Sequence, residues 1–167
     1  LTDVSNSMAQ ATNTITINAG TLEIGSAGRL NAGSYDKAIT NNGTFSYNST
    51  AAQTLSGNIT GTGSLTKNNT STLTLSGANT YTGVTTVNAG TLAISNNMTI
   101  GAIAGAGNMT LGAGFTLGTN SSTDSTFSGV ISSSGALMKN GNSTLTLSGN
   151  NTYSGGTTLN AGGININ

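Results

Sequence analysis

The stretch GSLTKNNTSTLTLSGANTYTGVTTVNAGTLAIS, residues 63–95, decides the fold of this chain, because it returns as residues 135–167. The second copy reads GALMKNGNSTLTLSGNNTYSGGTTLNAGGININ and is identical at 21 of the 33 aligned positions. A repeat at a fixed spacing is typical of architectures in which each unit covers the open core of its neighbour. The sequence therefore predicts a rod built by stacking, and a rod is suited to spanning, display and assembly.

The composition is polar but patterned. Thr (31), Gly (25), Asn (23) and Ser (21) make up three-fifths of the 167 residues, a mixture that often indicates disorder. Here, however, apolar residues fall in alternating pairs, and the most frequent residue is Thr, a β-branched strand former. The length suits one domain, residues 1–167, with a continuous but narrow core.

Apolar residues alternate with a period of two, in short runs bounded by Gly, Asn or Ser. Alternation places every second side chain on the same face of a strand, and the bounding residues supply turns. No segment has a helical period, so the predicted class is all-β. The side chains expected to stack in the core are Ile15, Ile17, Leu22, Ile24, Phe45, Leu65, Leu73, Leu75, Val87, Leu92, Ile94, Phe115, Leu117, Leu137, Leu145, Leu147, Leu159, Ile164 and Ile166.

The repeat unit is the stretch from the start of one copy to the start of the next. It divides into three coils of about 24 residues, which predicts a parallel β-helix of about seven coils. This division treats the NTYTG and NTYSG segments as loops, with Tyr81 and Tyr153 packing them against the rod. It makes residues 1–53 a degraded unit, 54–125 a complete one and 126–167 a partial one. Its corresponding strand positions are Leu22, Phe45, Leu65, Leu92, Phe115, Leu137 and Ile164. An alternative with steps of about 18 residues fits Leu73, Leu92, Met109, Phe127, Leu145 and Ile164.

Two motifs carry a family resemblance. LTLSGANTYTGVTTVNAGTL (residues 73–92) and LTLSGNNTYSGGTTLNAGG (residues 145–163) resemble the autotransporter-associated β-strand repeat of bacterial type V passenger domains, and TITINAGTLEIG (residues 14–25) resembles its second half. The resemblance implies a right-handed parallel β-helix, export from a Gram-negative cell and a secreted or cell-surface location. It brings no catalytic residues, because the repeat is a scaffold.

The ionisable residues do not suggest an enzyme. The chain has no His and no Cys, which excludes the usual catalytic triads and thiolate or imidazole metal sites. The acids fall in different predicted coils, and the bases form no stripe that would bind nucleic acid. No cofactor, metal or membrane span is expected. The acids are Asp3, Glu23, Asp36 and Asp124, and the bases are Arg29, Lys37, Lys67 and Lys139.

Three Thr-x-Thr pairs raise an ice-binding interpretation. A flat array that matches ice needs such a pair on every coil, whereas these recur only about once per repeat unit. Ordinary outward strand positions are therefore the preferred interpretation. Lys67 and Lys139, which share one repeat position, are expected in solvated turns. The pairs are Thr14/Thr16, Thr72/Thr74 and Thr144/Thr146.

The two ends of the chain suggest assembly. Neither end carries a capping helix, and the chain is expected to stop after the first strand of a coil and to start at the second. A second copy placed end to end would continue the helix, through an interface of Leu1, Val4, Ile164 and Ile166.

The expected function is therefore a non-enzymatic subunit that stacks head to tail into an extracellular filament or matrix fibre. One alternative is a segment of an autotransporter adhesin passenger that attaches to a host or abiotic surface, with neighbouring coils covering its ends. Another is a polysaccharide-binding β-helix, which would need a groove lined by acids or aromatic residues.

Overall fold

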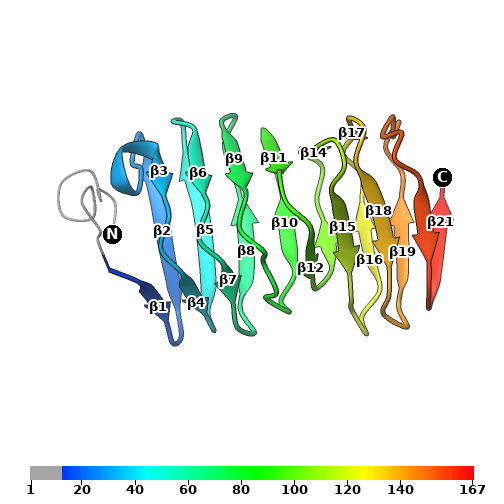
Figure 1. The fold of residues 1–167 in the computed structure, drawn as a ribbon, viewed down its shortest axis with the longest axis horizontal. Coiled ribbons are helices and arrows are strands. Elements are labelled where there is room, and N and C mark those ends of the chain that lie inside the picture. The colour runs from blue at the N-terminus through cyan, green and yellow to red at the C-terminus, as the bar shows by residue number, and fades with distance from the viewer. Residues whose placement is uncertain (1–12) are drawn as a thin grey trace.

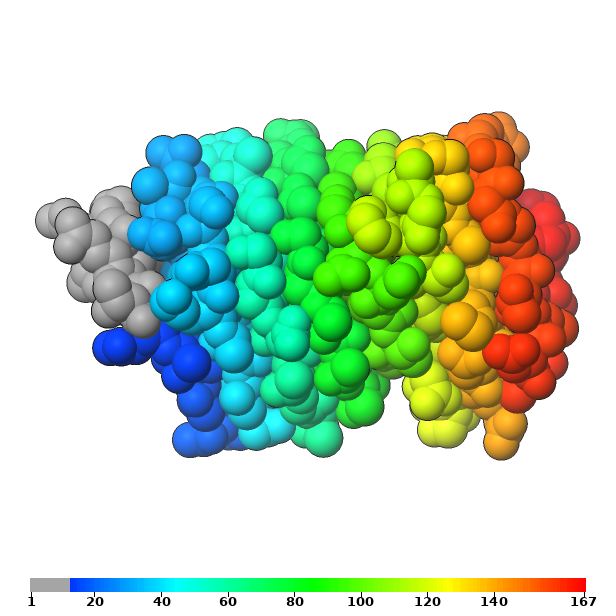
Figure 2. Space-filling view, viewed as in Figure 1, coloured from blue at the N-terminus to red at the C-terminus, as the bar shows by residue number. Residues whose placement is uncertain are grey.

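The strands wind into a parallel β-solenoid of about eight coils (Figure 1), which confirms the predicted fold class. The computed structural model describes residues 13–167, and its one helical element in that range is the 3-10 turn η1 (Asn31–Gly33). All of the described strand pairings are parallel, and successive coils follow one another along the rod from the N-terminal to the C-terminal end (Figure 2).

Each coil has three sides, here called face 1, face 2 and face 3. Face 1 consists of β1 (Ile15–Ile17), β4 (Ile39–Asn41), β7 (Ile59–Thr60), β12 (Met98–Ile100), β15 (Thr116–Thr119), β18 (Ala136–Lys139) and β20 (Thr157–Leu159). Face 2 consists of β2 (Thr21–Ser26), β5 (Thr44–Ser49), β8 (Ser64–Lys67), β10 (Thr85–Val87), β13 (Ile103–Ala104), β16 (Ser125–Phe127), β19 (Thr144–Leu147) and β21 (Gly163–Ile166). Face 3 consists of β3 (Ser34–Tyr35), β6 (Gln53–Leu55), β9 (Thr72–Leu75), β11 (Thr91–Ile94), β14 (Asn108–Leu111) and β17 (Ile131–Ser132).

The coils are shorter than the sequence analysis predicted. The stacked positions of face 1 are Ile15, Ile39, Ile59, Asn79, Met98, Leu117, Leu137 and Thr157, so a coil holds about 20 residues. Leu22, Phe45 and Leu65 do stack as expected. Leu65 then pairs with Thr85 rather than with Leu92, so the division into coils of about 24 residues is wrong from that point onward.

The NTYTG segment, residues 79–83, is not a loop outside the rod, and treating it as one made the predicted coils too long. Its backbone amides donate hydrogen bonds to the coil before it, from Thr80 to the Ile59 carbonyl and from Thr82 to the Gly61 carbonyl, both at 2.9 Å. The segment is therefore part of the wall of face 1. The rejected division into shorter steps was closer to the structure, since Leu92 stacks between Leu73 and Met109.

The two copies of the repeat lie on different faces. In the first copy β8 is on face 2 and β9 on face 3, whereas the equivalent β18 and β19 lie on faces 1 and 2. The local pairing is nevertheless the same, because β8 pairs with β10 and β18 pairs with β20, in each case one coil further along the chain. The repeat thus specifies how one coil stacks on the next, whichever face carries it.

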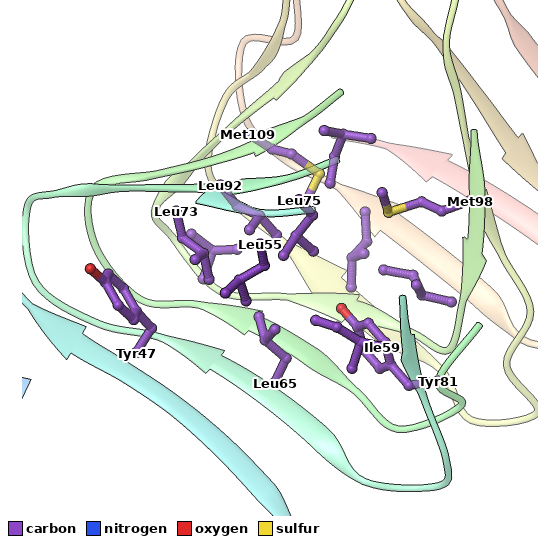
Figure 3. Close-up of a cluster of buried hydrophobic side chains, with 14 of the residues drawn as sticks. Tyr47, Leu55, Ile59, Leu65, Leu73, Leu75, Tyr81, Leu92, Met98 and Met109 are labelled. Atoms are coloured by element: carbon purple, nitrogen blue, oxygen red, sulfur yellow. The ribbon is translucent and has the colours of Figure 1, made fainter. Parts of the chain in front are cut away.

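The buried apolar side chains of all the coils form one core cluster. Figure 3 shows a part of it around Leu55, Leu75 and Tyr81. Among the predicted core positions, Leu22 and Ile164 are only partly buried. Phe115 precedes β15 and is also only half-buried, because the inward residues of that strand are Leu117 and Thr119. The predicted equivalence of Phe115 with the fully buried Phe45 is therefore wrong.

Three Asn-Ala-Gly corners have the same backbone conformation. Their glycines, Gly20, Gly90 and Gly162, have φ angles of +74°, +68° and +73°, in the left-handed region that favours glycine. A Cβ atom on Gly90 would overlap the carbonyl oxygens of Ser71 and Asn69 in the neighbouring coil, whereas no described atom lies within 4 Å of the corresponding point at Gly20. The same corner is thus more constrained inside the rod than near its N-terminal end.

Gly90→Ala should lower the free energy of unfolding by about 2 to 4 kcal/mol, since it combines backbone strain with a backbone overlap. Gly20→Ala should cost only about 1 kcal/mol, because it adds strain alone. Urea unfolding followed by circular dichroism measures both values. Equal losses for the two variants would show that coil packing does not add to the strain.

Candidate functional site

The C-terminal coil, formed by β20, β21 and the segment that leads into them, is uncovered (Figure 1). Among the described strands, β20 pairs only with β18, and β21 pairs only with β19. Leu159 is 52% exposed and Ile166 is 70% exposed. Both were predicted core residues, and they are exposed because no described coil lies beyond them.

A recess of about 560 Å³ opens at this end of the rod. Its lining includes Leu147, Tyr153 and Ile166, together with backbone and side chains of residues 149–152. The recess therefore combines apolar side chains with the unpaired edge of the last coil, which are the two features that a stacked strand would cover.

The first copy of the repeat shows what covers the same residues. Four large apolar side chains of the last coil are exposed or half-buried, and the residue at the same position of the first copy is buried in every case. In the first copy β12, β13 and β14 provide the cover, so the C-terminal coil has the form of an interior coil without a described neighbour. The pairs are Tyr153 and Tyr81, Leu159 and Val87, Ile164 and Leu92, and Ile166 and Ile94.

The two equivalent tyrosines make the same hydrogen bond in different surroundings. Tyr81 lies inside the solenoid beside Ile59 (Figure 3), and its hydroxyl is 2.7 Å from the Thr85 hydroxyl. Tyr153 makes the same contact with Thr157 at 2.6 Å, but this pair is exposed. Burial raises the pKa of Tyr81. The prediction that Tyr81 packs a protruding loop is wrong.

The equivalent lysines are also inside the rod, and the prediction of solvated turns is wrong. The Lys67 ammonium donates to the carbonyls of Asn68 and Asn69 at 2.5 and 2.8 Å, and to that of Ala89 in the next coil at 3.4 Å. Lys139 donates to the Gly141 carbonyl. Burial lowers the pKa of Lys67 to about 8 and lowers that of Lys139. The prediction rested on the fact that the two lysines share one repeat position. A shared position is equally compatible with a residue in the core and with one in a turn.

The acidic residues do not converge on a site. Glu23 accepts a hydrogen bond from Ser46, Asp36 pairs with Lys37 at 3.0 Å, and Asp124 accepts one from the Thr144 amide at 2.7 Å. Within residues 13–167 no group of three or more such side chains could hold a metal ion. The same range contains no helix with the length and hydropathy of a membrane span.

The predicted end-to-end interface is only partly described. Ile164 and Ile166 lie on β21 in the uncovered coil, on either side of an outward residue. Leu1 and Val4, like Asp3, lie outside the described residues.

Residues 65–94 and 137–166 match the passenger-associated-transport-repeat family. The chain contains two passenger-associated transport repeats. Each matched segment runs from β8 to β11 or from β18 to β21 and therefore includes the strand pairing described above. The predicted resemblance to autotransporter passenger repeats is confirmed, and it indicates a secreted or cell-surface protein. No curated protein and no solved structure matches the chain.

The two transport repeats provide a matched pair for one test. Tyr81→Phe should lower the free energy of unfolding by about 1 to 2 kcal/mol, because it leaves the buried Thr85 hydroxyl without its partner. Tyr153→Phe should change it by less than about 0.5 kcal/mol, since water replaces the lost partner. Chemical denaturation of the two variants checks this. If Tyr153→Phe lowered the free energy of unfolding as much as Tyr81→Phe does, the assignment of Tyr81 to a covered coil and Tyr153 to an uncovered one would be contradicted.

The buried lysines predict a stability that depends on pH. Because Lys67 has a pKa of about 8 in the fold and 10.5 as its ordinary value, the unfolded chain binds more protons between these values. Stability should therefore rise as the pH is raised from about 7.5 to about 9.5, below the range in which unfolded tyrosines ionise. Thermal unfolding over this range measures the slope.

Lys67→Met should reduce that slope by removing one of the two contributing groups, and a flat or falling profile in the unaltered chain would contradict the assignment.

Proposed function

We propose that this chain is a non-enzymatic β-solenoid scaffold that lengthens by stacking, its C-terminal coil joining the N-terminal coil of a second copy to form a surface filament or fibre. The repeat family and the fold indicate a passenger-type solenoid of a secreted or cell-surface protein. Assembly into a filament goes beyond this. The main support for the filament is that the C-terminal coil is uncovered, whereas the equivalent residues of the first repeat are buried by a following coil.

Two features of the coil support stacking. The exposed side chains Leu159 and Ile166 are stacked on the buried residues Lys139 and Leu147 of the preceding coil. A further coil would bury them at about 25 cal/mol for each Å² of apolar area. The free backbone edge of β20 and β21 would gain a parallel ladder in the same step. Side-chain burial and backbone pairing thus favour the same partner.

The order of the faces supports a second copy as that partner. The described chain starts with β1 on face 1 and β2 on face 2, and its last strands, β20 and β21, lie on the same two faces in the same order. Placed end to end, β1 of one copy would extend face 1 beyond β20, and β2 would extend face 2 beyond β21. The strands would keep the parallel direction of all the others.

A passenger segment that attaches to a surface is the second candidate, supported by the two transport repeats. In that case the covering coil belongs to a longer polypeptide rather than to a second copy. Both candidates use the same uncovered coil, so they differ only in where the next coil comes from.

The test is assembly of the purified chain, followed by light scattering and negative-stain microscopy. We expect fibres of uniform width, and Leu159→Glu with Ile166→Glu should abolish them, because two charges would be buried at the junction. Thr126→Glu with Thr146→Glu, which adds the same charge to outward positions of face 2, is the matched control and should still assemble.

Monomers at high concentration would reject the filament. A second arm then tests the passenger segment: residues 96–127 are fused after Asn167, which gives the second repeat the coil that follows the first. A higher unfolding temperature of this fusion would support a passenger segment whose own chain supplies the cover.

A further inference from the structure

Face 1 carries a column of threonines that the sequence spacing concealed. One outward threonine lies on each of five consecutive coils, and all five side chains are exposed. The register follows from the pairing of β1, β4 and β7, and from backbone hydrogen bonds that place residue 80 beside residue 60 and residue 99 beside residue 80. The column consists of Thr16, Thr40, Thr60, Thr80 and Thr99.

The column is not apparent from the spacing of Thr-x-Thr pairs along the chain. The three Thr-x-Thr pairs singled out from the sequence lie on different faces: Thr14/Thr16 on face 1, Thr72/Thr74 on face 3 and Thr144/Thr146 on face 2. Two further pairs, Thr60/Thr62 and Thr80/Thr82, lie on consecutive coils of face 1. With coils of about 20 residues, however, face 1 receives a threonine on every coil from the first to the fifth described coil. One threonine per coil therefore repeats regularly along the axis of the rod.

The array is regular and stiff. Strand spacing places the threonines about 4.8 Å apart, so that five of them extend over about 19 Å. A β-branched side chain has few χ1 rotamers, and the strands below are held by main-chain hydrogen bonds and a packed core. Each coil therefore presents a methyl group and a hydroxyl at a nearly fixed position.

A second column runs beside the first. Two residues further along the chain, Asn18, Asn42, Thr62 and Thr82 are also exposed. The strands and the wall segment that carry the threonines contain no acidic or basic residue. Of the aromatic residues in 13–167, Phe115 and Tyr153 are half-buried and the others are buried. This surface is thus uncharged, hydroxyl-rich and free of the stacking platforms that glycan sites use.

The other faces differ in exposure and in continuity. On face 2 the outward positions Glu23, Ser46, Thr66 and Thr86 are buried or half-buried, and only two of the four are threonines. Outward threonines of face 3, Thr54, Thr74 and Thr110, are only half-buried rather than exposed, and Ala93 interrupts their column. On face 1 the column ends where Gly118 follows Thr99. The five-coil array is therefore a property of face 1 between residues 16 and 99.

We propose that this part of face 1 binds ice. A rigid, flat array of hydroxyl and methyl groups at the strand spacing can hold a matching layer of ordered water, and each contact is weak but repeated on one rigid body. Charged groups would hold water in other orientations, and none interrupts the array. This function is independent of end-on stacking, because the side of the rod stays exposed when its ends are covered.

The test measures ice affinity of the full chain by partition into a growing ice hemisphere and by inhibition of ice recrystallisation. We expect the unaltered chain to enter the ice, and Thr40→Lys with Thr60→Lys to lose most of both activities, because two long charged side chains interrupt the uncharged threonine column. Thr54→Lys with Thr74→Lys on face 3 is the matched control and should keep both.

Circular dichroism checks that each variant is folded. If a lysine variant fails to fold, Thr60→Val is used instead, because it removes one hydroxyl and keeps the shape of the side chain. Exclusion of the unaltered chain from ice would overturn the proposal. So would equal losses for the face 1 and face 3 variants, or binding to insoluble polysaccharide without ice affinity.

Discussion

The structure depends on one constraint, which is that each coil must cover the apolar side chains of the coil before it. Parallel pairing fixes which residues meet, so Leu73, Leu92 and Met109 stack directly although their spacing along the chain is unequal. Differences in coil length are absorbed at the corners, where glycine and asparagine tolerate unusual backbone angles. Core continuity, backbone pairing and the open C-terminal coil all follow from this requirement.

Sequence patterns predicted the class of fold and the direction of most side chains, because alternation is a direct consequence of strand geometry. They failed on coil length for a physical reason. Asn79, Thr85 and Lys67 point inward although they are polar. Asn79 accepts from a backbone amide of the preceding coil, Thr85 contacts a tyrosine hydroxyl, and Lys67 donates to two carbonyls of its own coil and one of the next. A search for apolar pairs therefore skips these strands and counts too few coils.

The candidate site was only partly predictable. Ile164 and Ile166 were expected at an end of the rod because they close the sequence, and they do lie in the uncovered coil. The exposure of Leu159 could not be read from its residue type, since the equivalent Val87 is fully buried. What separates the two is the presence of a following coil, which is a property of the stack rather than of the residue. The same limit concealed the threonine column, whose members are neighbours only after stacking.

The rotation between the two repeats has a consequence for long rods of this kind. The repeat unit is not a whole number of coils of about 20 residues, so it returns to a different face each time, and copies of one outward side chain point in directions about a third of a turn apart. Further units of the same length would distribute that side chain in a spiral around the shaft. In such a shaft the side chain of any one repeat position would face each of the three sides in turn, whereas a column such as the threonines of face 1 depends on the coil spacing and stays on one side.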